Sequence, residues 1–122
     1  MKLFVTGAAG YIGSTFCYEA LKRGYEVVGI DNFSNSTRKN VNILEDTYAD
    51  KFKFYEADLL DDCLISFFKN FNKSDAVVHF AALKSVPESQ KKPDLYHKNN
   101  VEGTRKLVAC MMERSVEKLI FS

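Results

Sequence analysis

Short apolar runs alternate along the chain with longer stretches in which apolar residues recur every three or four positions. The short runs predict β-strands, and the periodic stretches predict α-helices. The strands are expected at 2–6, 26–30, 52–57, 76–82 and 118–121. The helices are expected at 11–23, from the polar segment 34–38 to about 50, at 58–71, and from 94 to about 114. The last helix is expected to bury a stripe formed by Val101, Thr104, Leu107, Val108, Met111 and Met112.

This alternation of strands and helices predicts the class of fold. Hairpins join antiparallel strands, whereas connections of this length imply parallel strands with helices on both faces of the sheet. The run at 76–82 is apolar almost throughout, as expected for a strand covered on both faces. Right-handed crossovers then predict an α/β fold with a doubly wound open parallel sheet, a Rossmann fold, in the order 3-2-1-4-5. No repeat or linker interrupts the pattern, so residues 1–122 are expected to form one domain.

Composition narrows the class of partner. The chain has 122 residues, 17 of them basic and 16 acidic, for a formal net charge of +1. This balance argues against a nucleic acid or an anionic membrane surface as a partner, because either would need a basic excess on one face. The most apolar stretch, 76–83, is far shorter than the roughly 20 residues that span a bilayer. No signal-peptide pattern opens the chain, so a cytoplasmic location is expected.

The cysteines and histidines predict neither disulfides nor a metal site. Cys17, Cys63 and Cys110 are odd in number and widely spaced, which is typical of reduced thiols in a cytosolic protein. Neither His79 nor His97 lies at ligand spacing from a cysteine, so no metal is expected. Neither histidine belongs to a catalytic triad pattern, and each is interpreted as a core or surface residue.

A glycine-rich loop follows the first predicted strand. Residues 6–13 read Thr-Gly-Ala-Ala-Gly-Tyr-Ile-Gly. Gly7 suits a tight turn, Gly10 allows the backbone to approach a diphosphate, and Gly13 allows the helix to pack closely on the sheet. The free N–H groups at the helix start would then face phosphate oxygens. Three glycines also occur in ordinary turns between a strand and a helix, but the order of strand, loop and helix favours a phosphate-binding loop.

Asp31 ends the second predicted strand, 18 residues after Gly13. Dinucleotide-binding folds place an acid about 20 residues after the glycine loop, where it accepts hydrogen bonds from the adenosine ribose. A carboxylate there repels a 2′-phosphate and favours NAD over NADP, and no arginine adjoins Asp31 to receive such a phosphate. The alternative is an aspartate that caps a helix or a turn.

Several segments together resemble one family. The spacing T-G-x-x-G-x-x-G is typical of the short-chain dehydrogenase/reductase superfamily. The chain is similar throughout to the N-terminal, NAD-binding part of the UDP-glucose 4-epimerase family, an extended branch of that superfamily. The segments that carry the resemblance are 6–13, 31–36 (Asp-Asn-Phe-Ser-Asn-Ser), 57–59 (Ala-Asp-Leu), 79–86 (His-Phe-Ala-Ala-Leu-Lys-Ser-Val), 88–89 (Glu-Ser) and 99–104 (Asn-Asn-Val-Glu-Gly-Thr).

The resemblance implies NAD as cofactor and assigns its contacts. The diphosphate would be lined by Gly7, Gly10, Tyr11, Ile12 and Gly13. The adenosine ribose and the nearby phosphate would be surrounded by Asp31, Asn32, Asn35 and Ser36. The adenine would meet Asp58 and Leu59, and the path toward the nicotinamide would be lined by Phe80, Ala81, Ala82 and Lys84. The remaining contacts would come from Asn99 and Ser122.

Four of these residues have simpler interpretations. Asp58 caps the third helix in the alternative reading, and one carboxylate can fill both roles. Lys84 is alternatively a solvated loop charge, although ligands bind at the carboxyl end of a buried strand in such sheets. Phe80 is equally plausible as a core residue. Asn99 on a helix facing the sheet would need hydrogen-bond partners, which favours a binding role.

The resemblance also implies a reaction whose catalytic residues this chain lacks. The family interconverts UDP-galactose and UDP-glucose by reversible hydride transfer to bound NAD, using a serine and a Tyr-x-x-x-Lys pair that lie beyond the fifth strand. Tyr18 and Lys22 have this spacing, but they fall on the predicted solvent face of the first helix. We therefore assign no catalytic residue, and expect the chain to be an inactive cofactor-binding fragment.

The sequence is also compatible with two other functions, namely another nucleotide-sugar epimerase or dehydratase, and a non-catalytic NAD-binding module.

Two surfaces predict self-association of the chain, namely the long helix and the exposed edge at 118–121. The resemblance implies that the assembly is a homodimer.

Overall fold

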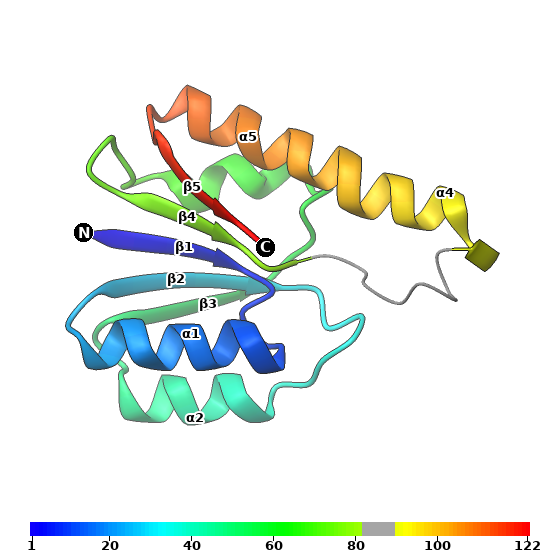
Figure 1. Cartoon of the computed structure of the whole chain (residues 1–122). Coiled ribbons are helices and arrows are strands. Elements are labelled where there is room, and N and C mark those ends of the chain that lie inside the picture. The colour runs from blue at the N-terminus through cyan, green and yellow to red at the C-terminus, as the bar shows by residue number, and fades with distance from the viewer. Residues whose placement is uncertain (82–89) are drawn as a thin grey trace.

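Parallel strands form one sheet with helices on both faces (Figure 1). The computed structural model describes residues 1–81 and 90–122 and, of Asn99, the backbone alone. Its strands are β1 (Lys2–Thr6), β2 (Glu26–Asp31), β3 (Phe52–Glu56), β4 (Ala76–His79) and β5 (Lys118–Phe121). Its helices are α1 (Tyr11–Lys22), α2 (Lys39–Thr47), the 3-10 helix η1 (Asp62–Phe68), α4 (Pro93–Tyr96), the π-helix η2 (His97–Glu102) and α5 (Gly103–Glu113).

The strand order is β3-β2-β1-β4-β5, which confirms the predicted topology. All four strand pairs are parallel, and in the central register Val5 of β1 pairs with Gly29 on one side and Val78 on the other. The strands begin and end close to the predicted positions, except that β4 ends at His79 rather than at 82. The carboxyl ends of these strands therefore meet at one edge of the sheet.

Two separate cores lie on the two faces of the sheet. Phe4 and Val5 are neighbours on β1, point to opposite faces, and are both fully buried. On one side α1 and α2 pack over Val5, and Cys17 of α1 belongs to this core. Burial raises the pKa of the Cys17 thiol to about 12, so this thiol stays protonated. On the other side, Phe68 of η1 stacks on Phe4 with ring centroids 4.2 Å apart, and α5 adds Leu107.

The third predicted helix, at 58–71, is shorter and tighter than expected. Residues 58–61 form a turn, because aspartate side chains there accept backbone N–H bonds that a helix would otherwise use. The Leu60 N–H donates to Asp58 at 2.9 Å, and the Asp58 N–H donates to Asp61 at 2.9 Å. Helical geometry, of the 3-10 type, is confined to Asp62–Phe68.

The last predicted helix is continuous from Pro93 to Glu113, but it buries a narrower stripe than expected. Met112 is 75% exposed and Val101 is also exposed, so the predicted stripe was wrong at both positions. Leu107 and Met111 are buried, as predicted. The residues before α5 follow the wider turn of a π-helix, which shifts Val101 out of the spacing that an α-helix would give it.

None of the helices in the described ranges has the length and apolar character that crossing a bilayer requires.

Candidate functional site

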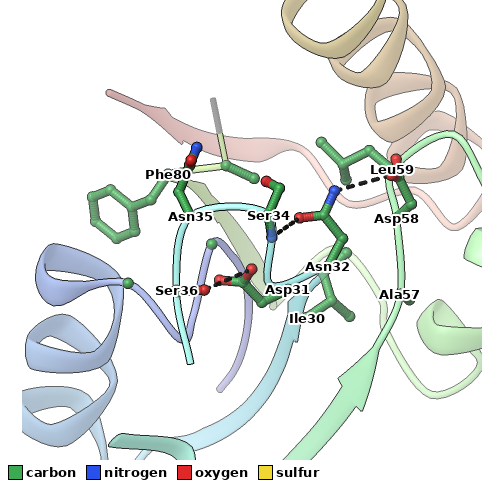
Figure 2. Close-up of a pocket in the computed structure, with 13 residues that line it drawn as sticks. Ile30, Asp31, Asn32, Ser34, Asn35, Ser36, Ala57, Asp58, Leu59 and Phe80 are labelled. Carbon is green, nitrogen blue, oxygen red and sulfur yellow. Dashed lines mark hydrogen bonds between the residues drawn. The ribbon is translucent and has the colours of Figure 1, made fainter. Parts of the chain in front are cut away.

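A crevice opens at the carboxyl edge of the sheet, between the loops that leave β1, β2, β3 and β4 (Figure 2). Its empty volume is about 620 Å³, including its open mouth. It lies where the chain order reverses between β1 and β4, which is the place where open α/β sheets bind ligands. The lining residues are Gly7, Gly10, Ile30, Asp31, Asn32, Ser34, Asn35, Ser36, Ala57, Asp58, Leu59, Phe80 and Ala81.

The glycine loop has the close contacts that its sequence predicts. Gly7 has a φ of +69°, and a Cβ on it would lie 2.9 Å from the backbone nitrogen of Ala81. A Cβ on Gly13 would overlap the Gly7 carbonyl oxygen and lie 2.8 Å from its carbonyl carbon. By contrast, a Cβ on Gly10 would meet only that oxygen within 4 Å, at 3.5 Å. The close contacts at Gly7 and Gly13 thus allow α1 to pack tightly against the end of β1, whereas the backbone at Gly10 has open space beside it.

The start of α1 presents N–H groups that have no partner within the helix, and they lie beside this space. Gly10 is the N-cap and provides no side-chain cap, and the first helical bond runs from the Ser14 N–H to the Gly10 carbonyl at 2.9 Å. The N–H groups of residues 11–13 therefore have no partner one turn back. The side chains of Tyr11 and Ile12 are 84% and 58% exposed and do not line the crevice. These residues can offer an anion their backbone amides.

Asp31 joins the glycine loop to the loop after β2. Its Oδ2 accepts a hydrogen bond from the Ala9 N–H at 3.0 Å. Its Oδ1 accepts from the Phe33 N–H at 2.9 Å and from the Ser36 hydroxyl at 3.2 Å, as Figure 2 shows for Ser36. Asp31 therefore does stabilise a turn, which is the alternative role that the sequence left open for it. Because an ionised carboxylate accepts about four hydrogen bonds, the turn role leaves capacity for a ligand hydroxyl.

Asn32 and Asp58 form a hydrogen-bonded pair that also lines the crevice. The Asn32 side-chain amide donates to Asp58 Oδ2 at 3.0 Å, and Asn32 Oδ1 accepts from the Ser34 N–H at 3.0 Å (Figure 2). Asp58 Oδ1 also accepts from the Leu60 N–H and so stabilises the turn at 58–61, but Asp58 does not cap η1, whose N-cap residue is Asp61. The pair fixes the separation of the loops after β2 and β3, and Leu59 beside it is buried under Gly103 of α5.

A buried network beneath the crevice was not anticipated from the sequence. The Thr6 hydroxyl oxygen accepts from the backbone N–H groups of Phe80 and Ala81, at 3.1 and 3.0 Å. His79 is buried, with Nδ1 2.6 Å from Thr6 Oγ1 and Nε2 3.0 Å from Thr104 Oγ1. Thr104 donates its own proton to the Asn100 carbonyl at 2.6 Å, so it accepts from Nε2–H of the imidazole. Thr6 then donates to Nδ1, and the network fixes β1, β4 and the long helix together.

Sequence reasoning could have found this network only from one signal, a histidine at the end of an otherwise apolar run. Of the two interpretations offered for His79, the core role is the one observed, whereas His97 is exposed. Ile30, Ser34 and Ala57 also line the crevice, and the sequence did not assign them to the site.

The remaining predicted cofactor contacts are Ala82, Lys84, Asn99 and Ser122. Ala82 and Lys84 lie outside the described residues, and Asn99 is placed only by its backbone in η2. Ser122 is exposed beyond β5, where its N–H donates to the His79 carbonyl at 3.3 Å, and it does not line the crevice.

The Tyr18 and Lys22 pair also lies away from the crevice. Tyr18 packs its ring against Tyr48, the C-cap residue of α2, and the ammonium group of Lys22 lies 6.0 Å from the Tyr18 ring centroid. The described ranges contain no group of three or more His, Cys, Asp or Glu side chains able to hold a metal ion.

The order of the sheet and the crevice at its switch point define a Rossmann-like α/β protein. Residues 3–122 match the NAD dependent epimerase/dehydratase family, and the chain belongs to that family.

The relatives of this chain include several UDP-glucose 4-epimerases. The chain is 44% identical to that of Bacillus subtilis over 122 residues, which are all of this chain and 36% of the relative. It is 43% identical to that of Klebsiella pneumoniae, over all of this chain and 88% of the relative. A crystal structure of the Bifidobacterium longum UDP-glucose 4-epimerase in complex with NAD⁺ and UDP matches with a TM-score of 0.90 and 36% identity, over all of this chain and 36% of that one.

The chain thus spans about a third of the Bacillus and Bifidobacterium proteins. It is homologous to the N-terminal, NAD-binding part of UDP-glucose 4-epimerases.

Proposed function

We propose that this chain binds NAD, holding its adenosine and diphosphate portions in the crevice. The observation that carries the proposal is the bond from the Ala9 N–H to Asp31 Oδ2, which puts a carboxylate beside a glycine loop and a helix start. Free amides there suit a diphosphate, and the carboxylate suits the hydroxyls of a ribose. The Bifidobacterium relative, whose structure was solved with NAD⁺, supports the assignment.

A titration of the 122-residue chain with NAD and, separately, with NADP tests this proposal. We expect saturable binding of NAD and much weaker binding of NADP, because a 2′-phosphate would meet the Asp31 carboxylate. Calorimetry gives both affinities, and circular dichroism establishes that the chain is folded. A folded chain that binds neither dinucleotide would contradict the proposal.

The proposed role of the whole protein is the interconversion of UDP-galactose and UDP-glucose. Bound NAD supplies reversible hydride transfer, and the residues of this chain bind and orient it. We assign no catalytic residue among them, and propose that the chain alone is inactive toward UDP-galactose. Similarity to several UDP-glucose 4-epimerases supports this substrate over those of other nucleotide-sugar epimerases or dehydratases, and over a non-catalytic module.

We also propose that the chain self-associates and is cytoplasmic. β5 pairs with β4 and leaves apolar side chains in contact with solvent, with Ile120 57% and Phe121 62% exposed. Exposed apolar edges favour association.

The proposed cytoplasmic location is supported by the three unpaired cysteines, which fit a reducing compartment.

Sedimentation velocity at increasing protein concentration tests self-association. We expect a species heavier than the monomer, and expect Ile120→Lys to weaken its formation, because a charge on an edge strand opposes pairing. A monomer at every concentration would contradict the expectation.

A further inference from the structure

Arg38 is the arginine closest in sequence to residues 31–36, which carry the proposed ribose contacts, and its guanidinium is held away from the crevice. It is the N-cap residue of α2 and follows Ser36 by two positions. Its Nη2 lies 2.8 Å from Glu45 Oε1, and its Nε donates to Asn42 Oδ1 at 3.3 Å. The guanidinium carbon lies 5.5 Å from the centre of the Phe54 ring on β3. These three partners lie on α2 and β3, and Arg38 is not among the described residues that line the crevice.

Three contacts stabilise this orientation of the Arg38 side chain. A cation at a helix N-terminus is opposed by the helix dipole. Asn42 and Glu45 are four and seven residues further along α2, so they lie on one face and draw the guanidinium along the helix. The Phe54 ring adds a cation–π contact on the sheet side.

Arg38 is nevertheless within reach of the crevice. Two residues span at most about 7 Å of chain, and an extended arginine side chain covers a comparable distance. Ser36, two positions back, donates to Asp31 at 3.2 Å. The Phe54 ring beneath Arg38 lies 5.6 Å from the ring of Phe33, whose N–H also donates to Asp31. By these lengths, a guanidinium released from Glu45 can extend toward the Asp31 carboxylate.

We propose that Glu45 is a specificity-determining residue, because it holds Arg38 out of the ribose end of the crevice and so maintains discrimination against NADP. The inference rests on the proposed binding of NAD. An arginine near the acid after β2 is the group that dinucleotide-binding folds use to accept a 2′-phosphate. Because the Glu45 carboxylate binds the Arg38 guanidinium, the positive charge of Arg38 does not offset the negative charge of Asp31 at the ribose end of the crevice.

The test compares Glu45→Gln with a matched control on the same helix. Asp46 is the next residue of α2 and is exposed, so Asp46→Asn removes one negative charge without removing the partner of Arg38. We expect Glu45→Gln to raise NADP affinity about two- to five-fold, the range that release of an exposed ion pair allows, with NAD affinity little changed. Asp46→Asn should leave both affinities close to wild type. Competition against bound NAD measures NADP when its direct titration is too weak.

A second variant identifies the group responsible. In Glu45→Gln/Arg38→Ala, the gain in NADP affinity should disappear, because no guanidinium remains to meet the phosphate. An unchanged NADP affinity in Glu45→Gln, an equal gain in Asp46→Asn, or a gain that survives the loss of Arg38 would each overturn the inference. If wild type binds NAD and one of these results appears, the inference alone fails. If wild type binds neither dinucleotide, the proposed function fails, and this inference fails as well because it rests on that function.

Discussion

Gly13→Ala is expected to prevent stable folding of the chain. The added methyl group would overlap the Gly7 carbonyl oxygen and lie 2.8 Å from its carbonyl carbon, so the neighbour in its way is backbone rather than a flexible side chain. To relieve this contact, α1 must move away from β1, and the core that contains Val5 and Cys17 must open. Interiors are close-packed, so we expect the free energy of unfolding to fall by about 4 kcal/mol or more. Urea denaturation followed by circular dichroism measures this change.

Gly10→Ala is the matched control for that variant. Gly10 has a φ of −71°, which alanine adopts without strain, and its added Cβ would lie 3.5 Å from the Gly7 carbonyl oxygen. We expect this variant to fold normally and to bind NAD on the order of tenfold more weakly or worse, because its methyl group occupies space beside the free amides of α1. Normal stability of Gly13→Ala would contradict the packing role. Unchanged NAD binding by Gly10→Ala would contradict the phosphate-binding role of the loop.

The fold was predictable because its signals are local and repeated. Apolar runs and helical periodicity alternate, and parallel strands follow from connections too long for hairpins. Lys118–Phe121 was predicted with the bounds that the structure gives. Two of the errors have a clear physical cause: side chains compete with the backbone at 58–61, and the helical repeat changes before Gly103. Periodicity carries no information about either effect.

For the candidate site, the sequence predicted which residues meet but not which hydrogen bonds they form. The parallel topology brings the loops after β1, β2, β3 and β4 to one edge, so glycine, aspartate and asparagine residues in them were expected to meet. The bonds that fix their spacing join residues far apart in sequence, such as Ala9 with Asp31 and Asn32 with Asp58. The His79 network depends in the same way on side-chain directions in three elements. A spacing rule identifies the residue types but not these partners.

Replacement of Asp31 is the variant expected to change cofactor choice most. Hydrogen bonds to a charged acceptor contribute about 1.5–3 kcal/mol each, so loss of the ribose contact in Asp31→Ala should weaken NAD binding by roughly ten- to a hundredfold. Removing the carboxylate also removes its repulsion of a 2′-phosphate, so the affinity for NADP relative to NAD should rise at least about tenfold. Parallel calorimetric titrations of wild type and variant measure both affinities.

The loop contacts of Asp31 make the ratio of the two affinities the decisive measurement. Asp31→Ala also frees the N–H groups of Ala9 and Phe33, so a loosened loop alone would weaken NAD and NADP together. Asp31→Asn removes the charge but keeps one oxygen to accept a backbone N–H, and it should shift the ratio in the same direction with less loss of NAD binding. If both variants weakened the two dinucleotides equally, Asp31 would be a turn residue and not a cofactor-selecting one. A shift toward NADP in both variants would show that the negative charge at the end of β2 selects the cofactor.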